Sequence, residues 1–305
     1  MKEGIVVKST GSWYLVRLED ERTVECRIRG KFRMGEIRTT NPVAVGDQVE
    51  VEENGVESVI TGIRPRRNYI IRKSTNLSKE AHILASNVDQ ALLVVTVNHP
   101  VTSTVFIDRF LATAEAYAIP AVLVFNKIDL YEGETRDKGE SLMAIYRNIG
   151  YKCYGISVTT GENMDEIREL VCHKVTVLSG LSGVGKSSLI NSLAPGLGLK
   201  TAVISDAHDS GKHTTTFAEM FPLKEGGFII DTPGVRSFGT VDMKKEEISH
   251  FFREIFAKAG DCRFYNCTHT HEPGCAVMDA VGKGEISESR YASYLSMLED
   301  SGKYR

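Results

Sequence analysis

The chain has 305 residues, 42% of them hydrophobic and 25% charged, which is ordinary for a globular protein and leaves room for two or three domains. Its formal net charge of −3 excludes a wholly basic nucleic-acid coat protein. It contains no apolar run of about 18 residues that would span a bilayer and no apolar N-terminal signal stretch, so we expect no membrane partner. Its six cysteines are not spaced as a disulfide framework, so we expect a cytoplasmic protein.

The first 66 residues alternate short apolar strands with turns rich in Gly, Asn and charged residues. The expected strands are Gly4–Val7, Trp13–Leu18, Thr23–Ile28, Gln48–Val51 and Val56–Ile63. Five short strands in so few residues predict a small closed barrel of the OB type. The segment Arg64–Asn68 then breaks the pattern, and we expect a linker there.

From about residue 80 the pattern changes to an alternation of strands and helices. Ala91–Val97 is a continuous apolar run, which is typical of a strand covered on both faces. Further strands are expected at Ala121–Phe125, Cys153–Ser157, Val175–Leu178 and Phe228–Ile230, and helices at Val105–Tyr117, Lys138–Ile149, Met164–Leu170 and Lys186–Leu193. This alternation predicts an α/β fold with a mostly parallel sheet and helices on both sides.

Residues 240–305 show no strand pattern. Helices are expected at Lys244–Ala259 and Ser287–Glu299, on either side of a loop rich in Cys and His. We therefore expect three domains: a barrel at 1–66, an α/β domain at 67–239 and a helical domain at 240–305.

A phosphate-binding loop runs from Gly180 to Ser187, which fits G-x-x-x-x-G-K-[ST] between an apolar strand and a helix. Its glycines let backbone N–H groups turn toward phosphate oxygens, and the helix N-terminus adds partial positive charge. We expect Lys186 to act in catalysis by reaching the β- and γ-phosphates, and Ser187 to ligate Mg²⁺. The expected nucleotide-binding residues here are Gly180, Ser182, Gly183, Val184, Gly185, Lys186, Ser187 and Ser188.

A second motif, Asn126-Lys127-Ile128-Asp129, follows an expected strand and predicts selection of guanine. The Asp129 carboxylate would accept hydrogen bonds from N1–H and the exocyclic amine of guanine, a donor pair that adenine lacks. The stem of Lys127 would lie over the base, and Asn126 would tie neighbouring loops together. Ser157 and Val158, also after a strand, would supply backbone contacts to the guanine carbonyl. A solvated turn is the other interpretation of N-K-x-D.

A third motif, D-x-x-G, runs from Asp231 to Gly234 after the strand Phe228–Ile230. Asp231 would hold Mg²⁺ through its water shell, and the N–H of Gly234 would sense the γ-phosphate during catalysis. Thr215, within the run 214–216, is expected to offer a hydroxyl to the metal, although its neighbours are equally suited by type.

Position 235, where small GTPases use a Gln to orient the attacking water, carries Val235. An apolar side chain cannot orient water, so either turnover is slow or another polar group substitutes. His213, next to the threonine run, is the candidate catalytic residue, although a loop histidine is also commonly just solvated.

Three cysteines cluster near the C-terminus, and the remaining three are scattered rather than spaced as a disulfide framework. Cys262, Cys267, His269 and Cys275 give C-x₄-C-x-H-x₅-C, a set that closes a tetrahedral structural Zn²⁺ site. His271 is a competing imidazole. A loop with little core of its own is expected to need the metal to fold.

The order of these motifs differs from that of ordinary G proteins, in which the phosphate loop comes first and N-K-x-D comes late. A site built from loops at one sheet edge survives such a permutation. With a barrel before it and a Cys/His region after it, the whole chain resembles the RsgA (YjeQ/YloQ) family of circularly permuted GTPases. The resemblance rests on Gly180–Ser188, Gly211–Thr216, Asp231–Gly234 and the cysteine spacing, and it favours His269 over His271.

The resemblance implies a GTPase that acts in late maturation of the small ribosomal subunit, with hydrolysis stimulated by that subunit. The implied partners are GTP, GDP, the subunit and its rRNA, and we expect a monomer. Two basic stretches would face RNA, namely Arg27, Arg29, Lys31, Arg33 and Arg38 with Phe32, and Arg64, Arg66, Arg67, Arg72 and Lys73. Two alternatives are a nucleotide-regulated RNA-binding scaffold and a permuted GTPase that serves another process.

Overall fold

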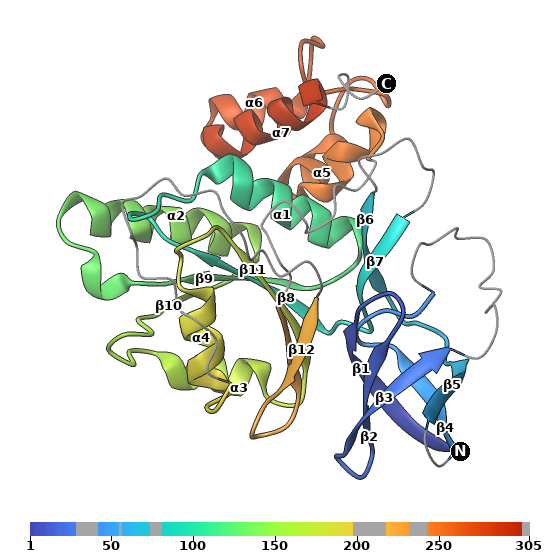
Figure 1. Cartoon of the computed structure of the whole chain (residues 1–305). Coiled ribbons are helices and arrows are strands. Elements are labelled where there is room, and N and C mark those ends of the chain that lie inside the picture. The colour runs from blue at the N-terminus through green and yellow to red at the C-terminus, as the bar shows by residue number, and fades with distance from the viewer. Residues whose placement is uncertain (29–41, 55–56, 74–80, 198–217, 232–242, 301–305) are drawn as a thin grey trace, which may run out of the picture.

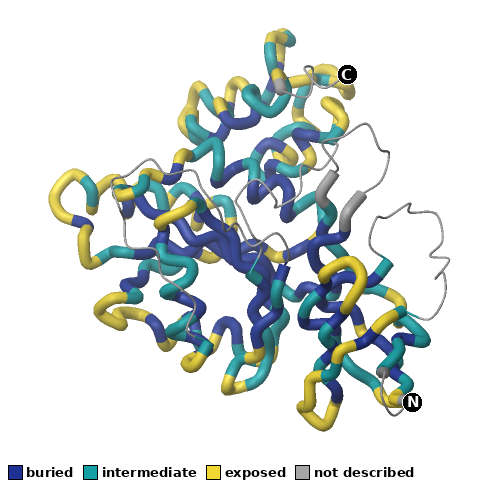
Figure 2. The backbone as a smooth tube through the Cα atoms, viewed as in Figure 1, coloured by how far each residue is buried: buried dark blue, intermediate teal, exposed yellow. Residues whose placement is uncertain are grey.

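The computed structural model describes residues 1–28, 42–54, 57–73, 81–197, 218–231 and 243–300. Buried backbone concentrates in the central strands, with exposed turns at the periphery (Figure 2).

The N-terminal strands form a closed barrel. Its strands are β1 (Lys2–Ser9), β2 (Tyr14–Leu18), β3 (Thr23–Ile28), β4 (Gln48–Asn54) and β5 (Glu57–Ile63). They pair in the order β1-β2-β3-β5-β4, and β4 returns to β1 to close the barrel. Alternate residues such as Val6, Val16 and Val49 point inward and are fully buried, because successive strand side chains face opposite sides. The predicted OB-type barrel is confirmed.

The second part is a parallel sheet covered on both faces (Figure 1). The parallel strands are β8 (Gln90–Val95), β9 (Ala121–Phe125), β10 (Lys152–Gly155), β11 (Val175–Gly180) and β13 (Phe228–Asp231), in the order β10-β9-β8-β11-β13. Helices α1 (Thr104–Ala116) and α2 (Glu134–Ile149) pack on one face, while α3 (Met164–Val171) and α4 (Lys186–Leu193) pack on the other. Because successive side chains of β8 point to opposite faces, Leu93 packs in the core under α1 and α2, and Leu92 packs in the core under α3 and α4.

One short strand joins the barrel to this sheet. β12 (Glu219–Pro222) pairs antiparallel with β13 and, at Lys8–Glu219, with β1, so that all these strands form one 11-stranded sheet. The Lys8 ammonium lies 3.2 Å from a Glu219 carboxylate oxygen. Sequence patterning missed β12 because four residues are too few to show a period.

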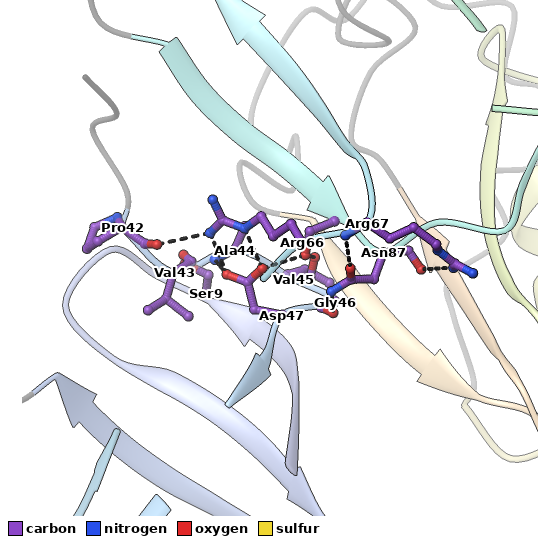
Figure 3. A network of polar contacts seen from close by, with 11 residues as sticks. Ser9, Pro42, Val43, Ala44, Val45, Gly46, Asp47, Arg66, Arg67 and Asn87 are labelled. Carbon is purple, nitrogen blue, oxygen red and sulfur yellow. Dashed lines mark hydrogen bonds and ion pairs between the residues drawn. The ribbon is translucent and has the colours of Figure 1, made fainter. Parts of the chain in front are cut away.

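The segment Arg64–Asn68, which we expected to be a linker, is instead packed against the barrel. The guanidinium of Arg66 donates to both carboxylate oxygens of Asp47 at 2.6 Å, and Asp47 is fully buried (Figure 3). The hydroxyl of Ser86 donates to the same carboxylate at 2.7 Å. These bonds hold the barrel against the hairpin of β6 (Tyr69–Lys73) and β7 (Ala81–Ser86), which the sequence analysis also missed.

The C-terminal described residues are helical, with no strand in 243–300. The helices are η3 (Lys245–Phe251), α5 (Arg253–Ala259), α6 (Ala276–Gly282) and α7 (Glu288–Asp300). The single helix expected at Lys244–Ala259 is divided at Phe252, whose backbone is extended, and α6 was not expected. Among the described residues, no helix has the length and apolarity that a membrane crossing requires.

These helices pack on α1 around a buried ionic cluster. The guanidinium of Arg290 donates to Asp108 at 2.8 Å and to both carboxylate oxygens of Glu254 at 2.6 and 3.1 Å. The Tyr146 hydroxyl donates to Asp108 at 2.7 Å. Because Arg290 and Asp108 have side-chain exposures of 1% and 0%, this pair links α7 to α1 out of contact with water.

Candidate functional site

The predicted nucleotide motifs meet at one edge of the parallel sheet. Asn126 follows β9, Ser157 comes two residues after β10, the loop from Gly180 follows β11, and Asp231 ends β13. All four positions are carboxyl ends of parallel strands, which is where open α/β sheets bind ligands.

The glycine-rich loop has a conformation that only glycine adopts readily. Gly180, Gly183 and Gly185 have φ angles of 148°, 81° and 100°. A Cβ at Gly180 would lie 2.5 Å from the carbonyl oxygen of Val94, and a Cβ at Gly185 would overlap the side-chain amide of Asn126. The loop therefore turns tightly against its neighbours before α4 begins at Lys186.

Asn126 is the residue that holds three of the motifs together. Its buried side chain donates to the carbonyl oxygen of Val184 at 2.8 Å and accepts from the backbone N–H of Val158 at 3.2 Å. One amide thus bonds the N-K-x-D loop to the phosphate loop and to the loop after β10. Within that loop, the fully buried Ser157 accepts a hydrogen bond from the backbone N–H of Thr160 at 3.1 Å.

Lys127 adds a second link from the N-K-x-D loop to the phosphate loop, and also bonds to the segment that follows β8. Its ammonium donates to the carbonyl oxygens of Gly183 at 2.8 Å and of His99 at 2.7 Å. Burial lowers the pKa of Lys127, and the charge of Asp129 opposes this shift. Sequence reasoning missed His99, because its contribution is a backbone oxygen that has no residue signature.

Asp129 lies in the short turn η1 (Ile128–Leu130), where it is exposed. Its carboxylate is therefore open to a base at this edge. The exposed Ser182 and the half-buried Ser187 and Ser188 lie along the phosphate loop and the first turn of α4.

Lys186 and Asp231 lie close enough for the charge of each to affect the pKa of the other. The ammonium of Lys186 donates to the carbonyl oxygens of Gly180 and Leu181 at 2.7 and 2.8 Å. Burial lowers the pKa of Lys186, and Asp231 opposes the shift. Burial raises the pKa of Asp231, and Lys186 opposes that shift. Each group is therefore in a site where a partly desolvated charge needs a partner, as expected for a phosphate and cation site.

Several expected residues lie outside the described part of the chain. They are His213, Thr214, Thr215, Thr216, Gly234 and Val235 of the motifs, and Arg29, Lys31, Phe32, Arg33 and Arg38 of the first basic stretch.

The three arginines of the second basic stretch whose side chains the structure describes each form an ion pair within the fold, whereas the side chains of Arg72 and Lys73 lie outside the described part. Arg64 pairs with Glu3, Arg66 with Asp47, and Arg67 with Asp89. On the barrel, the guanidinium of Arg27 lies 4.0 Å from the centre of the half-exposed Trp13 ring. Ion pairing within the fold therefore uses most of the described arginines that the sequence assigned to RNA.

A separate site gathers Cys262, Cys267, His269 and Cys275, whose ligand atoms all lie within 4.8 Å of one another. The His269 Nδ1 atom is 3.5 Å from the sulfur atoms of both Cys262 and Cys275. Tetrahedral Zn²⁺ with bonds of about 2.0–2.3 Å requires ligand atoms about 3.5–3.8 Å apart, so the arrangement fits this metal. His271 is exposed and hydrogen bonds to Thr270 instead, outside the group.

The protein environment of this group favours a cation. Burial, with the neighbouring thiols Cys275 and Cys262, raises the pKa of Cys267 to about 12. Thiolates packed this closely need a positive charge between them to persist at neutral pH. The hydroxyl of Tyr291 donates to the His269 backbone oxygen at 2.7 Å and so fixes this part of the loop on α7.

Two family models match the chain, the RsgA N-terminal domain at residues 3–60 and the RsgA GTPase at residues 63–241. The small ribosomal subunit biogenesis GTPase RsgA of Bacteroides fragilis is 58% identical over 306 residues, and that of Phocaeicola vulgatus 56%, each match covering 99% of both chains.

Two solved structures are similar over the whole chain. YjeQ from Thermotoga maritima has a TM-score of 0.80 and 36% identity, with 100% of this chain and 99% of that chain covered. YloQ, described as a circularly permuted GTPase, has a TM-score of 0.76 and 32% identity, with 100% and 96% covered. The chain belongs to the RsgA family of circularly permuted GTPases.

Proposed function

We propose that this protein hydrolyses GTP to GDP and phosphate during late maturation of the small ribosomal subunit, and that the subunit stimulates hydrolysis. The observation that supports the GTPase part is the Asn126 amide, which bonds the N-K-x-D loop to the glycine-rich loop and to the Ser157–Val158 loop at one edge of the sheet. The ribosomal part rests on the names of the full-length relatives.

The phosphates would lie in the glycine-rich loop, bound by backbone N–H groups and by Lys186. Phosphate oxygens would then replace the carbonyl oxygens of Gly180 and Leu181 as acceptors of the Lys186 hydrogen bonds. Ser187, Thr215 and Asp231 would hold Mg²⁺, which neutralises charge on the β- and γ-phosphates when bound. Binding an anion beside Lys186 offsets the burial that lowers its pKa.

Guanine would be read by Asp129, with the Lys127 stem against the ring and the Ser157–Val158 backbone at the carbonyl. The two hydrogen bonds of Lys127 hold its stem in place without the base. The Gly234 N–H would contact the γ-phosphate, and His213 would orient the attacking water in place of the missing Gln.

Cys262, Cys267, His269 and Cys275 would hold one structural Zn²⁺ per chain. Four protein ligands leave no open position, so the metal would stabilise the loop and take no part in hydrolysis.

We further propose a cytoplasmic monomer with three functional units: a barrel at 1–66 that contacts rRNA, a GTPase unit at 67–239 and a zinc-binding unit at 240–305. Trp13 and Arg27 are the described barrel residues that offer an aromatic face and a cation to RNA.

The test is the rate of GTP hydrolysis by the full chain, measured with and without purified small subunits. We expect subunits to raise the rate, and Lys186→Ala to lower it about 100-fold or more because a charge-stabilising donor is lost. An unchanged rate with subunits at low and physiological salt overturns the ribosomal part. Tight rRNA binding that is indifferent to GDP or a GTP analogue, with normal growth of a Lys186→Ala strain, favours the scaffold alternative.

A further inference from the structure

A cavity of about 400 Å³ lies at the sheet edge opposite the nucleotide motifs. It is bordered by the starts of β8, β9 and β10 and by the residue before β11, at Gln90, Ala121, Lys152 and Lys174, and it is closed on one side by Arg253 of α5. It is therefore separated from the guanine pocket by the length of the strands. Its volume is within the range of sites for small organic ligands.

The lining of this cavity is positively charged. Lys152, Lys174 and Arg253 line it, and Asp89 is the one acid among the described lining residues. The Asp89 carboxylate is already compensated, because it accepts from Arg67 at 2.6 Å and from the Val175 backbone N–H at 2.8 Å.

The two lysines differ from the arginine in how their charge is used. Arg253 donates to Glu115 at 2.7–2.8 Å and to the Gly150 carbonyl oxygen at 3.1 Å, so it forms a fixed, charge-balanced wall. Neither the Lys152 nor the Lys174 ammonium has a polar partner among residues that the structure describes. Two unpaired cations at one cavity attract an anion.

The rest of the lining is suited to an organic group. Ala121, Val122 and Leu170 lie at the floor and are at most 7% exposed, and Pro120 adds a further apolar surface. The Gln90 amide is held by bonds to the Leu170 carbonyl oxygen at 2.9 Å and the Thr176 hydroxyl at 3.0 Å, so the floor is rigid. Inorganic phosphate alone would leave most of this volume unfilled.

We infer that this cavity binds a small phosphate monoester, with Lys152 and Lys174 on the phosphate and the apolar floor against the organic part. An occupant would contact both the sheet and α5, and so would stabilise the packing of the C-terminal helices on the GTPase sheet. The site is independent of GTP hydrolysis and uses none of the nucleotide motifs.

The test uses the full chain saturated with Mg²⁺ and GDP, with AMP and inorganic phosphate as probes and binding measured by calorimetry and ³¹P NMR. AMP is suitable because Asp129 has no donor pair to accept from adenine. We expect saturable AMP binding that is tighter than that of phosphate and weakens about tenfold or more in Lys152→Glu/Lys174→Glu. Lys138→Glu, an exposed lysine on α2 outside the lining, is the matched control and should bind AMP normally.

GTP turnover by the double variant verifies its fold, because neither lysine belongs to the nucleotide site. Absence of saturable AMP binding at 10 mM, or equal binding by the double variant, overturns the inference. Lysine-dependent binding of a short RNA without binding of AMP also overturns it, because the occupant would then be a nucleic acid.

Discussion

Arg290→Met tests how strongly the buried ionic cluster holds the C-terminal helices on α1. The substitution keeps an unbranched side chain and removes the guanidinium that donates to Asp108 and Glu254. Asp108 is fully buried, so its carboxylate loses its charge partner and cannot be hydrated. Breaking a buried ion pair from one side costs about 3–5 kcal/mol, a large part of the roughly 5–15 kcal/mol that stabilises a typical protein.

The assay is equilibrium urea unfolding followed by the helical circular dichroism signal. With a slope of about 3 kcal/mol per M, the midpoint should fall by about 1–2 M. Arg253→Met is the matched control, because Arg253 also pairs with an acid of α1, Glu115, but is 40% exposed. A pair of that exposure is expected to contribute about 1 kcal/mol or less.

The double variant Asp108→Asn/Arg290→Met should lose less stability than the sum of the losses in its single variants. Each single variant leaves one buried charge without its partner, whereas the double variant removes both charges of the pair. Equal midpoints for Arg290→Met and Arg253→Met, or strict additivity of the double variant, would refute the reasoning.

Three further predictions concern the barrel contact, the metal and the loop link. Gly46→Ala should lower the stability measured by thermal unfolding by about 2 kcal/mol or more, whereas Gly11→Ala should lower it by about 1 kcal/mol. Both glycines have positive φ, but only a Cβ at Gly46 overlaps the Ser86 carbonyl oxygen. Chelation should remove one Zn²⁺ per chain and raise protease cleavage at the Cys262–Cys275 loop, and Cys262→Ser should have the same effect; an unchanged cleavage pattern would contradict the zinc site. Asn126→Ala should weaken GDP affinity about tenfold or more by titration, because two loops lose their buried partner.

The strand and helix pattern of the α/β region was predictable because its elements are long and periodic. β9, predicted at Ala121–Phe125, has those bounds, and α4 begins at Lys186 as expected. β12 was not predictable, because it is short and pairs with strands that are distant in the sequence. The β6–β7 hairpin pairs within itself, but Ile70 and Leu84 are buried in the core beside the parallel sheet, which no local pattern shows.

The nucleotide motifs could be proposed from the sequence because their chemistry requires particular residue types at fixed spacing. The contribution of His99 was not readable, since its backbone oxygen is brought to Lys127 by the fold. The same limit explains the error over Arg66: composition shows its charge, but only the fold shows that Asp47 neutralises it.

The most direct test of the shared guanine pocket is the nucleotide preference of Asp129→Asn. Wild-type protein should bind and hydrolyse GTP and not ATP. The variant should lose GTP affinity about 10- to 100-fold and gain affinity for xanthosine triphosphate, because an amide donates to the C2 oxygen that replaces the guanine amine. Equal use of ATP and GTP by the wild type, or an unchanged preference for GTP over xanthosine triphosphate in the variant, would contradict a pocket formed jointly by Asp129 and the phosphate loop.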